Sequence, residues 1–282
     1  MATGARRRLD VELLRRGLTE SRQQARHLID AGRVLVSGAP ADKAGRLVAP
    51  GEPIRVLGPP ARYVGRGGDK LAGALARFDL HPEGARALDA GASTGGFTDA
   101  LLQAGARSVV AVDVGRAQLH ERLRADPRVD VREQTDIRAV RPDDVGGPLD
   151  IVVADLSFIS LRRVIGPLLD LLADHGDLVV LVKPQFEAGR AEVSRGRGVI
   201  RDPDVWRRVL DDAVVAIEEA GGAIMDAMVS PLRGADGNAE FLVHVRRPEQ
   251  TPGSSAPGRA HALDVGALVR EAAGEGEGEG TA

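Results

Sequence analysis

ALDAGASTGGFTDALLQAGARSVVAVDV, residues 87–114, is the stretch of sequence that decides the fold of this chain. A short apolar run ends at Asp89, a glycine-rich loop follows, and a helix is predicted over residues 97–104. A second apolar strand then ends at Asp113. Glycine lets the backbone approach a ligand closely, and the first turn of a helix offers free N–H groups to a carboxylate or phosphate. The stretch therefore predicts a strand, loop, helix and strand unit that binds a ligand.

The spacing of the glycines distinguishes between two cofactor classes. A dinucleotide fingerprint has the form G-x-G-x-x-G, whereas this loop reads D-A-G-x-x-x-G-G-F. The pattern resembles the first motif of S-adenosylmethionine (SAM)-dependent methyltransferases, which implies that Asp89 and the loop hold the methionine end of SAM and that Asp113 binds the ribose. A tight turn without a ligand is the alternative. The expected cofactor-binding residues, here and later in the chain, are Asp89, Gly91, Ala92, Ser93, Gly95, Gly96, Phe97, Asp113, Val114, Asp136, Ile137 and Asp155.

Length and composition are typical of a soluble globular protein. The 282 residues suffice for a large domain and a small one, with 43% hydrophobic and 28% charged residues. No apolar run is long enough to cross a membrane, and the arginine-rich N-terminus lacks the apolar segment of a signal peptide, so we expect a cytoplasmic protein. The chain has no cysteine, which excludes disulfides, cysteine metal sites and a thiolate nucleophile. We expect no bound metal.

Charge is unevenly distributed along the chain. Residues 1–66 hold 13 Lys and Arg against 6 Asp and Glu, whereas the remainder holds 25 against 35. A basic segment of this kind suggests a polyanionic partner. Within it, two short helices precede small strands separated by Gly and Pro. We expect the second helix to begin at Ser21, with Gln24 completing a capping box.

This order of elements, and above all the phrase ARHLIDAGRVLVSG at residues 25–38, resembles the ribosomal-protein-S4-type RNA-binding domain. The resemblance implies that arginines of this segment bind RNA. Arg22 and Arg26 share one face of the predicted helix because they are four residues apart. The alternative is that these arginines only keep an exposed face in water. The expected RNA-binding residues are Arg6, Arg7, Arg22, Arg26, Arg33 and Arg66.

The rest of the chain alternates apolar strands with helices, which predicts a mostly parallel sheet that is covered on both faces. The run LDIVVAD ends in Asp155, and the run LVVLV is followed at once by Lys183. Ligands of such sheets bind at the carboxyl ends of the strands, where Asp89, Asp113, Asp155 and Lys183 are all expected. Asp136 is placed where a carboxylate could meet the adenine amino group, although a turn residue without a ligand explains it equally well.

Seven phrases extend the resemblance to most of the chain: GRGGDKL, LDAGASTGGFTDALL, AVDVG, VVADLSFISL, VKPQFE, GVIRDP and GNAEFL. Over residues 5–247 the sequence resembles the TlyA family of ribosomal RNA 2′-O-ribose methyltransferases, which are often named haemolysins. The resemblance implies an S4-type α+β domain at residues 1–60, a linker at 61–66, and a methyltransferase domain related to the FtsJ/RrmJ group at 67–248. That domain should have a Rossmann-like α/β sheet of seven strands. Residues 249–282, rich in Pro, Ser and Gly, are expected to be disordered.

The TlyA resemblance also implies an activity and a catalytic tetrad. The substrate would be cytidine ribose in 16S or 23S ribosomal RNA, and the tetrad falls on Lys70, Asp155, Lys183 and Glu240. A ribose 2′-hydroxyl is a very weak acid, so its methylation needs an acceptor for the proton. Lysine can accept the proton only when neutral, which a nearby cation and partial burial favour. We hypothesise that Lys183 is the base, that Lys70 supplies the second charge, and that the two carboxylates orient the amines.

Three other functions are alternatives on the sequence alone. A base N-methyltransferase usually carries D/N-P-P-Y/F where this chain has Asp155-Leu156-Ser157-Phe158, and it does not need two lysines. A non-catalytic RNA-binding assembly factor would keep the fold without binding SAM. A pore-forming haemolysin finds no support, because no segment of the sequence would span or coat a membrane.

Overall fold

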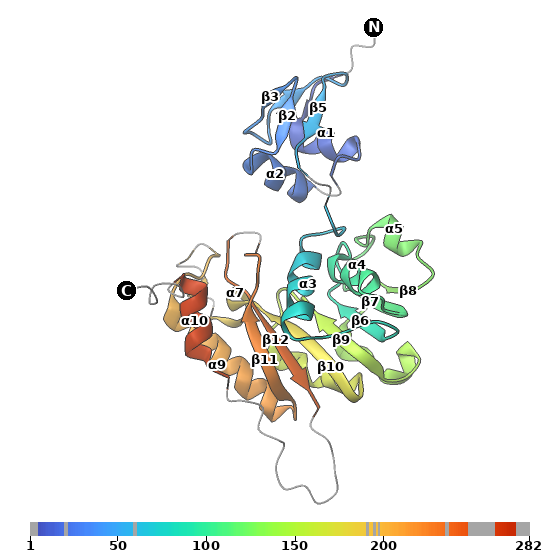
Figure 1. Ribbon diagram of the computed structural model, residues 1–282, viewed down its shortest axis with the longest axis vertical. Coiled ribbons are helices and arrows are strands. Elements are labelled where there is room, and N and C mark those ends of the chain that lie inside the picture. Colours follow the sequence, from blue (N-terminus) through green and yellow to red (C-terminus); the bar gives the residue numbers. More distant parts are fainter. Residues whose placement is uncertain are drawn as a thin grey trace, which may run out of the picture. The chain divides into compact units, whose positions relative to one another are not determined.

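The computed structural model describes residues 5–19, 22–58, 61–189, 192, 193, 196, 198–234, 237–247 and 263–274. The chain forms two compact units, which divide between Gly65 and Arg66. The first unit holds the small strands and two helices, and the second is built on the large sheet (Figure 1). Ser21 and the side chain of Gln24, which were expected to form a capping box, lie outside the described part of the chain.

The first unit is the expected small α+β domain. Leu9 and Leu13 on one helix and Ala25 and Ile29 on the next are buried in a single core, because residues four apart lie on the same face of a helix. Strand β2 pairs antiparallel with β3 and β5, and β1 pairs antiparallel with β4. The elements are β1 (Arg7–Arg8), α1 (Leu9–Arg15), α2 (Arg22–Asp30), β2 (Val34–Val36), β3 (Ala39–Pro40), β4 (Leu47–Val48) and β5 (Ile54–Val56).

The second unit contains a seven-stranded sheet in the order β11-β12-β10-β9-β6-β7-β8. Strands β8, β7, β6, β9 and β10 are parallel, and β12 is antiparallel to both of its neighbours. The middle of the sheet consists of fully buried Leu and Val residues, as expected for strands covered on both faces. The predicted mostly parallel sheet is confirmed. The strands are β6 (Arg86–Ala90), β7 (Ser108–Val112), β8 (Val129–Arg132), β9 (Leu149–Ala154), β10 (Leu172–Val182), β11 (Ala223–Val229) and β12 (Phe241–Arg246).

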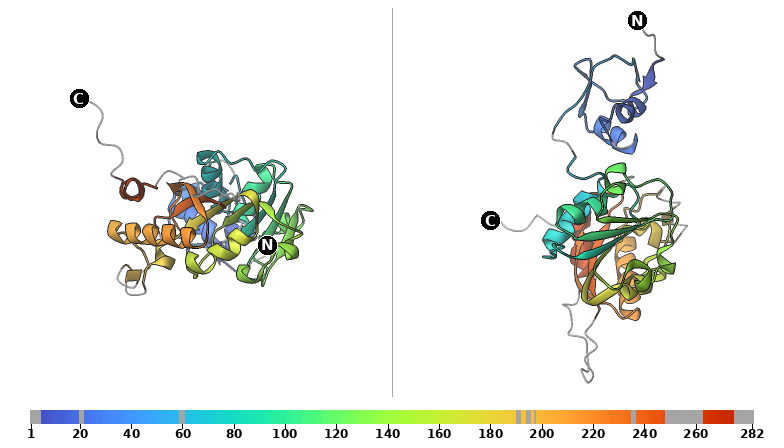
Figure 2. Two further views of the ribbon diagram at one scale, coloured as in Figure 1. Left: turned by 90° about the horizontal axis from the view of Figure 1, so that it is seen from below. Right: turned by 90° about the vertical axis from the view of Figure 1, so that its right-hand side faces the viewer.

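Helices cover both faces of this sheet. The right-hand view of Figure 2 shows α3 and α4 on one side of the sheet and α9 on the other. Helices α3 and α4 pack against each other, and α9 packs against α6, η3 and β11. The helices of this unit are α3 (Gly67–Arg77), α4 (Gly96–Gln103), α5 (Glu121–Arg124), η1 (Ile137–Ala139), η2 (Pro142–Val145), η3 (Leu161–Arg163), α6 (Ile165–Asp170), α7 (Pro184–Glu187), α9 (Pro203–Glu219) and α10 (Val265–Ala273).

Helix α10 corrects the expectation that residues 249–282 are disordered. Asp264 caps the helix by accepting a hydrogen bond from the backbone N–H of Ala267 at 2.9 Å, and Gly274 ends it with a φ of +82°. The helix packs against α9 and β11. Apolar residues at helical spacing were present in the sequence, but the surrounding Gly-, Glu- and Ser-rich composition concealed them. The residues that α10 adds to the main core are Val265, Leu268, Val269 and Ala272.

The contribution of α10 to stability can be measured with Leu268→Ala. Truncating a buried leucine loses transfer free energy and leaves a cavity, so the free energy of unfolding should fall by about 2–4 kcal/mol. Urea unfolding of the full chain measures this change. Glu271→Ala, on the exposed side of the same helix, should change it by less than about 0.5 kcal/mol. An unchanged midpoint for Leu268→Ala would show that the helix does not belong to the core.

Candidate active site

The glycine-rich loop between β6 and α4 has no room for side chains at two positions. Gly91 has a φ of +84°, and a Cβ there would lie 2.5 Å from the backbone carbonyl oxygen of Asp155. Gly95 has a φ of +100°, and a Cβ there would collide with the side chain of Leu123. Both angles lie in the left-handed region, which only glycine adopts readily. The end of β6 can therefore lie directly against the end of β9.

A cavity of about 600 Å³ lies at the carboxyl ends of β6, β7 and β9. A volume of this size suits a small-molecule cofactor. The predicted cofactor-binding residues that line it are Gly91, Ser93, Asp113, Val114, Asp136, Ile137 and Asp155. The other predicted residues are not in the lining and belong to the strand, loop and helix beside it: Asp89, Ala92, Gly95, Gly96 and Phe97.

Asp113 is held rigidly at the end of β7. Its Oδ2 accepts a hydrogen bond from the backbone N–H of Ser93 at 2.8 Å, and its Oδ1 accepts one from that of Gly115 at 2.6 Å. Because a carboxylate has about four acceptor positions, these two bonds orient the group and leave capacity for a ligand. The carboxylate ties the glycine-rich loop to the segment that follows β7.

The carboxylate of Asp136 is paired with Arg138, two residues later in the sequence. Its carboxylate accepts a hydrogen bond from the backbone N–H of Arg138 at 3.0 Å and forms an ion pair with the guanidinium of that residue at 2.5 Å. The side-chain hydrogen bond from Arg138 lowers the pKa of Asp136 to about 2. An adenine amino group would have to share this carboxylate with Arg138, so its contact with adenine stays a prediction.

Asp89 is a fully buried carboxylate with one unsatisfied oxygen. Oδ2 accepts hydrogen bonds from the backbone N–H and the hydroxyl of Thr98 at 2.8 and 2.7 Å. Oδ1 has no hydrogen-bond partner within the described part of the chain. Burial, together with the negative charges of Asp155 and Asp113, raises the pKa of Asp89 to about 7 against the effect of Thr98. A cationic ligand in the adjacent cavity would favour the ionised form.

The four residues of the expected tetrad form two ion pairs. Lys183 follows β10 directly, and its Nζ pairs with Asp155, which follows β9. Lys70 stands on the second turn of α3, and its Nζ lies 2.5 Å from Oε2 of Glu240, which precedes β12. Both amines are largely buried, with 10% of each side chain exposed. The pairing agrees with the hypothesis that the carboxylates orient the amines.

The beginning of α3 lies beside the Asp155 carboxylate. A Cβ on Gly67 would be 3.9 Å from Oδ2 of Asp155, and Lys70 lies three residues later on the same face of the helix. The two ion pairs are therefore neighbours at one edge of the sheet. In the whole sequence the only lysines are Lys43, Lys70 and Lys183, so two of the three are in this site.

Among the residues that were not predicted for the site, three aromatic or hydroxyl side chains lie near Lys183 or at the cavity. The hydroxyl of Ser157 lies 3.2 Å from Nζ of Lys183. Phe158 also lines the cavity, with a φ of +63° and 90% of its surface exposed, and its ring lies 4.9 Å from that of Phe186. The phrase VVADLSFISL contained two of them, but a Ser and a Phe have no spacing rule that assigns them to a site. Their positions depend on the turn after β9.

The predicted RNA-binding arginines divide into two groups. Arg33 donates from Nε to the carbonyl oxygen of Leu57 at 2.8 Å, and Arg66 donates to that of Arg233 at 2.9 Å. These two therefore also hold segments of the chain together. The others are exposed on the first unit: Arg6, Arg7, Arg22 and Arg26.

Comparison with known proteins decides the family. Residues 63–247 match the model of the FtsJ-like methyltransferases, and residues 7–54 match the S4 domain. The chain is 47% identical over 242 residues to the 16S/23S rRNA (cytidine-2′-O)-methyltransferase TlyA of Mycobacterium tuberculosis, a match that covers 86% of this chain and 90% of the relative. This chain belongs to the TlyA family.

Two further relatives of this TlyA family member carry another name. Hemolysin A of Brachyspira hyodysenteriae is 38% identical over 238 residues, covering 84% of this chain and 98% of the relative. A solved structure described as a hemolysin of Streptococcus thermophilus superposes with a TM-score of 0.75 at 39% identity, covering 96% of this chain and 97% of that one. None of the helices in the described ranges has the length and apolar content that a membrane crossing needs.

The cavity suits SAM, the cofactor of this TlyA family member. SAM carries an ammonium and a sulfonium group, and the carboxylates of Asp89, Asp113 and Asp155 lie in or beside the cavity. The unsatisfied Oδ1 of Asp89 could accept a hydrogen bond from a cationic donor. The absence of a Cβ at Gly91 keeps the backbone at the cavity wall. The residues present therefore fit the cofactor.

Asp89 predicts a pH dependence of stability in the absence of SAM. Its folded pKa of about 7 exceeds the value of about 3.9 for an unfolded Asp, so the folded state binds more protons between these pH values. The contribution of this group to stability is therefore present at low pH and is lost as pH rises from about 4 to about 7, by at most a few kcal/mol. Asp89→Asn should remove this decline.

Urea unfolding at a series of pH values measures the effect, as the difference between wild type and Asp89→Asn. Asp174→Asn, at an exposed carboxylate, is the control. Wild type and Asp174→Asn both keep Asp89. If their stability changes with pH by the same slope as that of Asp89→Asn, the pH dependence does not come from Asp89.

Proposed function

We propose that this protein transfers the methyl group of SAM to the 2′-hydroxyl of a cytidine ribose in ribosomal RNA. The Mycobacterium tuberculosis relative is named for this reaction on 16S and 23S rRNA. The observation that supports the proposal most directly is the pair of lysine–carboxylate contacts, Lys183 with Asp155 and Lys70 with Glu240, at the edge of the SAM cavity. A ribose hydroxyl needs such a group because it does not ionise by itself near neutral pH.

In this proposal Lys183 acts as the proton acceptor. SAM supplies an electrophilic methyl group on a positively charged sulfur. Proton transfer needs a neutral amine, so in this proposal Lys183 has to give up one proton to water before it reacts. Its neutral Nζ would then take the 2′-hydroxyl proton as the oxygen bonds to the methyl carbon and the bond from that carbon to sulfur breaks, leaving the electron pair on sulfur as a neutral thioether. Asp155 and Ser157 contact Nζ and hold the amine in place.

Lys70 has a different role in the proposed reaction. It is paired with Glu240, whose side chain is 3% exposed. Because this carboxylate is almost completely buried, it fixes the position of the ammonium group tightly. A cation held there can contact the ribose hydroxyl or a neighbouring phosphate. We assign Lys70 to electrostatic positioning and Lys183 to proton transfer.

The surroundings of Lys183 also suit a nucleotide substrate. Phe158 is 90% exposed at the cavity and lies beside Phe186, whose ring centroid is 5.7 Å from Nζ of Lys183. Exposed aromatic rings stack on unpaired bases in RNA-binding proteins. The S4 domain supplies a second RNA-binding part with exposed arginines. We therefore propose ribosomal RNA, free or within a ribosomal subunit, as the partner.

Lys183→Ala should abolish methyl transfer and leave SAM affinity nearly unchanged, because the side chain serves the proton and not the cofactor. Lys183→Arg should be equally inactive, because a guanidinium keeps the charge but cannot lose its proton near neutral pH. Incorporation of labelled methyl groups into rRNA and SAM calorimetry measure the two properties. Lys43→Ala, the remaining lysine of the chain, is the matched control. Substantial activity in Lys183→Arg would exclude proton transfer by Lys183.

The chemical position of the new methyl group separates ribose methylation from base methylation. A 2′-O-methyl group removes the nucleophile that attacks the neighbouring phosphodiester, so the modified linkage should resist alkaline cleavage at a cytidine. Alkaline hydrolysis of rRNA treated with the enzyme and SAM shows this as a missing band. A methylated product that remains fully sensitive to alkali would favour an N-methyltransferase, and failure to bind SAM would favour a non-catalytic assembly factor.

A further inference from the structure

The carboxylate of Asp10 is a buried centre around which three arginines gather in the first unit. Arg8 Nε lies 3.0 Å from Oδ1, while Arg22 Nη2 and Arg26 Nε lie 3.0 and 3.3 Å from Oδ2. The Asp10 side chain is 0% exposed, whereas the three arginine side chains are 47%, 50% and 54% exposed. Burial acts to raise the pKa of Asp10, but the hydrogen bonds and charges of Arg8 and Arg22 outweigh it and hold the pKa at about 2. The carboxylate therefore stays negative among three positive charges.

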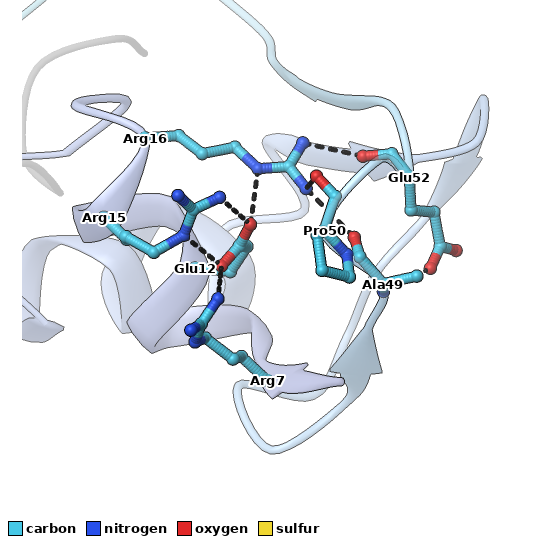
Figure 3. A network of polar contacts seen from close by, with 7 residues as sticks. All are labelled: Arg7, Glu12, Arg15, Arg16, Ala49, Pro50 and Glu52. Carbon is cyan, nitrogen blue, oxygen red and sulfur yellow. Dashed lines mark hydrogen bonds and ion pairs between the residues drawn. The ribbon is translucent and has the colours of Figure 1, made fainter. Parts of the chain in front are cut away.

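Glu12, two residues later, gathers a different set of arginines that is tied into the fold (Figure 3). Arg16 donates from Nε to Glu12 at 2.8 Å, and its other nitrogens donate to the carbonyl oxygens of Ala49, Pro50 and Glu52 at 2.7–3.1 Å. Arg16 is only 19% exposed, so this network fastens the loop before β5 to α1. The remaining partners of the Glu12 carboxylate are Arg7 and Arg15.

We propose that Asp10 is a positioning residue for RNA, which holds Arg8, Arg22 and Arg26 together as one phosphate-binding group, called here the Asp10 cluster. This inference rests on the proposed RNA substrate. A guanidinium has five N–H donors, and the contacts with Asp10 use one or two of them on each arginine. Charge-assisted bonds from guanidinium to phosphate are strong and geometrically specific.

The shared carboxylate has two physical effects on the arginines. It reduces the mutual repulsion of three cations that approach within a few ångströms of one another. It also restricts long side chains that would otherwise lose rotamer entropy when they bind a phosphate. Preorganisation of this kind increases affinity by lowering the cost of binding. The arginines come from β1 and α2, so Asp10 on α1 unites contacts from separate elements.

The direction in which Asp10→Asn changes the RNA affinity distinguishes positioning of the arginines from a simple effect of net charge. Asp10→Asn removes a negative charge and makes the first unit more positive by one. If only the net charge mattered, the variant would bind RNA more tightly and with a steeper salt dependence. If Asp10 positions the arginines, the variant binds more weakly although its positive charge is larger. A purely structural role would change stability without changing the salt dependence of the folded protein.

The test measures binding of the full chain to a fluorescently labelled RNA hairpin, without SAM, over a range of salt concentrations. For Asp10→Asn we expect the Kd to rise about tenfold and the slope of log K against log salt to fall by about 1–2, as one or two phosphate contacts are lost. Unchanged or tighter binding would overturn the proposal. Because no methyl transfer is involved, failure of the proposed reaction leaves this readout intact.

Glu12→Gln is the control with the same change of charge. We expect it to lower the thermal stability of the first unit, since the Arg16 network loses its centre, and to change the RNA affinity of the folded protein by less than about threefold. An equal loss of affinity and slope in Glu12→Gln and Asp10→Asn would remove the special role of Asp10.

A double-mutant cycle tests whether Asp10 acts through the arginines. In a chain that already carries Arg8→Gln, Arg22→Gln and Arg26→Gln, the further change Asp10→Asn should alter the Kd by less than about twofold, because the groups that it positions are gone. Additive losses would contradict the proposal. If Asp10→Asn unfolds the first unit, the pair Arg22→Lys and Arg26→Lys decides instead. These changes keep the charge but lose the fork geometry, so affinity should fall, and unchanged affinity would overturn the proposal.

Discussion

The close contact between the ends of β6 and β9 is the constraint on which the rest of the site depends. The backbone N–H of Asp155 donates to the carbonyl oxygen of Ala90 at 3.0 Å, and the space above Gly91 is filled by the carbonyl oxygen of Asp155. Any side chain at Gly91 would separate these two strand ends. The contact brings the cofactor loop and the Asp155–Lys183 pair to one edge of the sheet, where Gly91 and Asp155 both line the cavity.

Buried carboxylates perform three different tasks in this chain. Asp10 and Glu12 are surrounded by arginines that hold their pKa values at about 2. Glu240 is paired with a single ammonium group. Asp89 pairs with no cation in the described part of the chain, and its pKa rises to about 7. A buried charge without a partner is costly, which explains why Asp10, Glu12 and Glu240 are each paired with cations and why the pKa of Asp89 is raised.

Sequence reasoning predicted most of the fold and much of the site because both follow from local patterns. Apolar runs identified the strands, and parallel strands that end at one edge brought Asp113, Asp155 and Lys183 together. It failed at α10, where four apolar residues were embedded in a Gly- and Glu-rich tail. Nor did the sequence indicate that Arg33 donates a hydrogen bond to the carbonyl oxygen of Leu57, and its contact with RNA stays a prediction. Ion pairs between separate elements, such as Asp10 with Arg22, depend on the tertiary structure and cannot be predicted from sequence spacing.

Because lysine is scarce in this chain, most signals from lysine-specific reagents or labels come from the site. Arginine supplies nearly all the positive charge of this chain, and lysine occurs at three positions, of which Lys70 and Lys183 are in the site. The guanidinium of arginine stays protonated, whereas the primary amine of lysine can lose its proton and react as a nucleophile. Besides the α-amino group, acylating or reductively alkylating reagents that select primary amines can therefore modify only Lys43, Lys70 and Lys183. Isotopic enrichment of lysine alone would give three sets of signals, and two of them would come from the site.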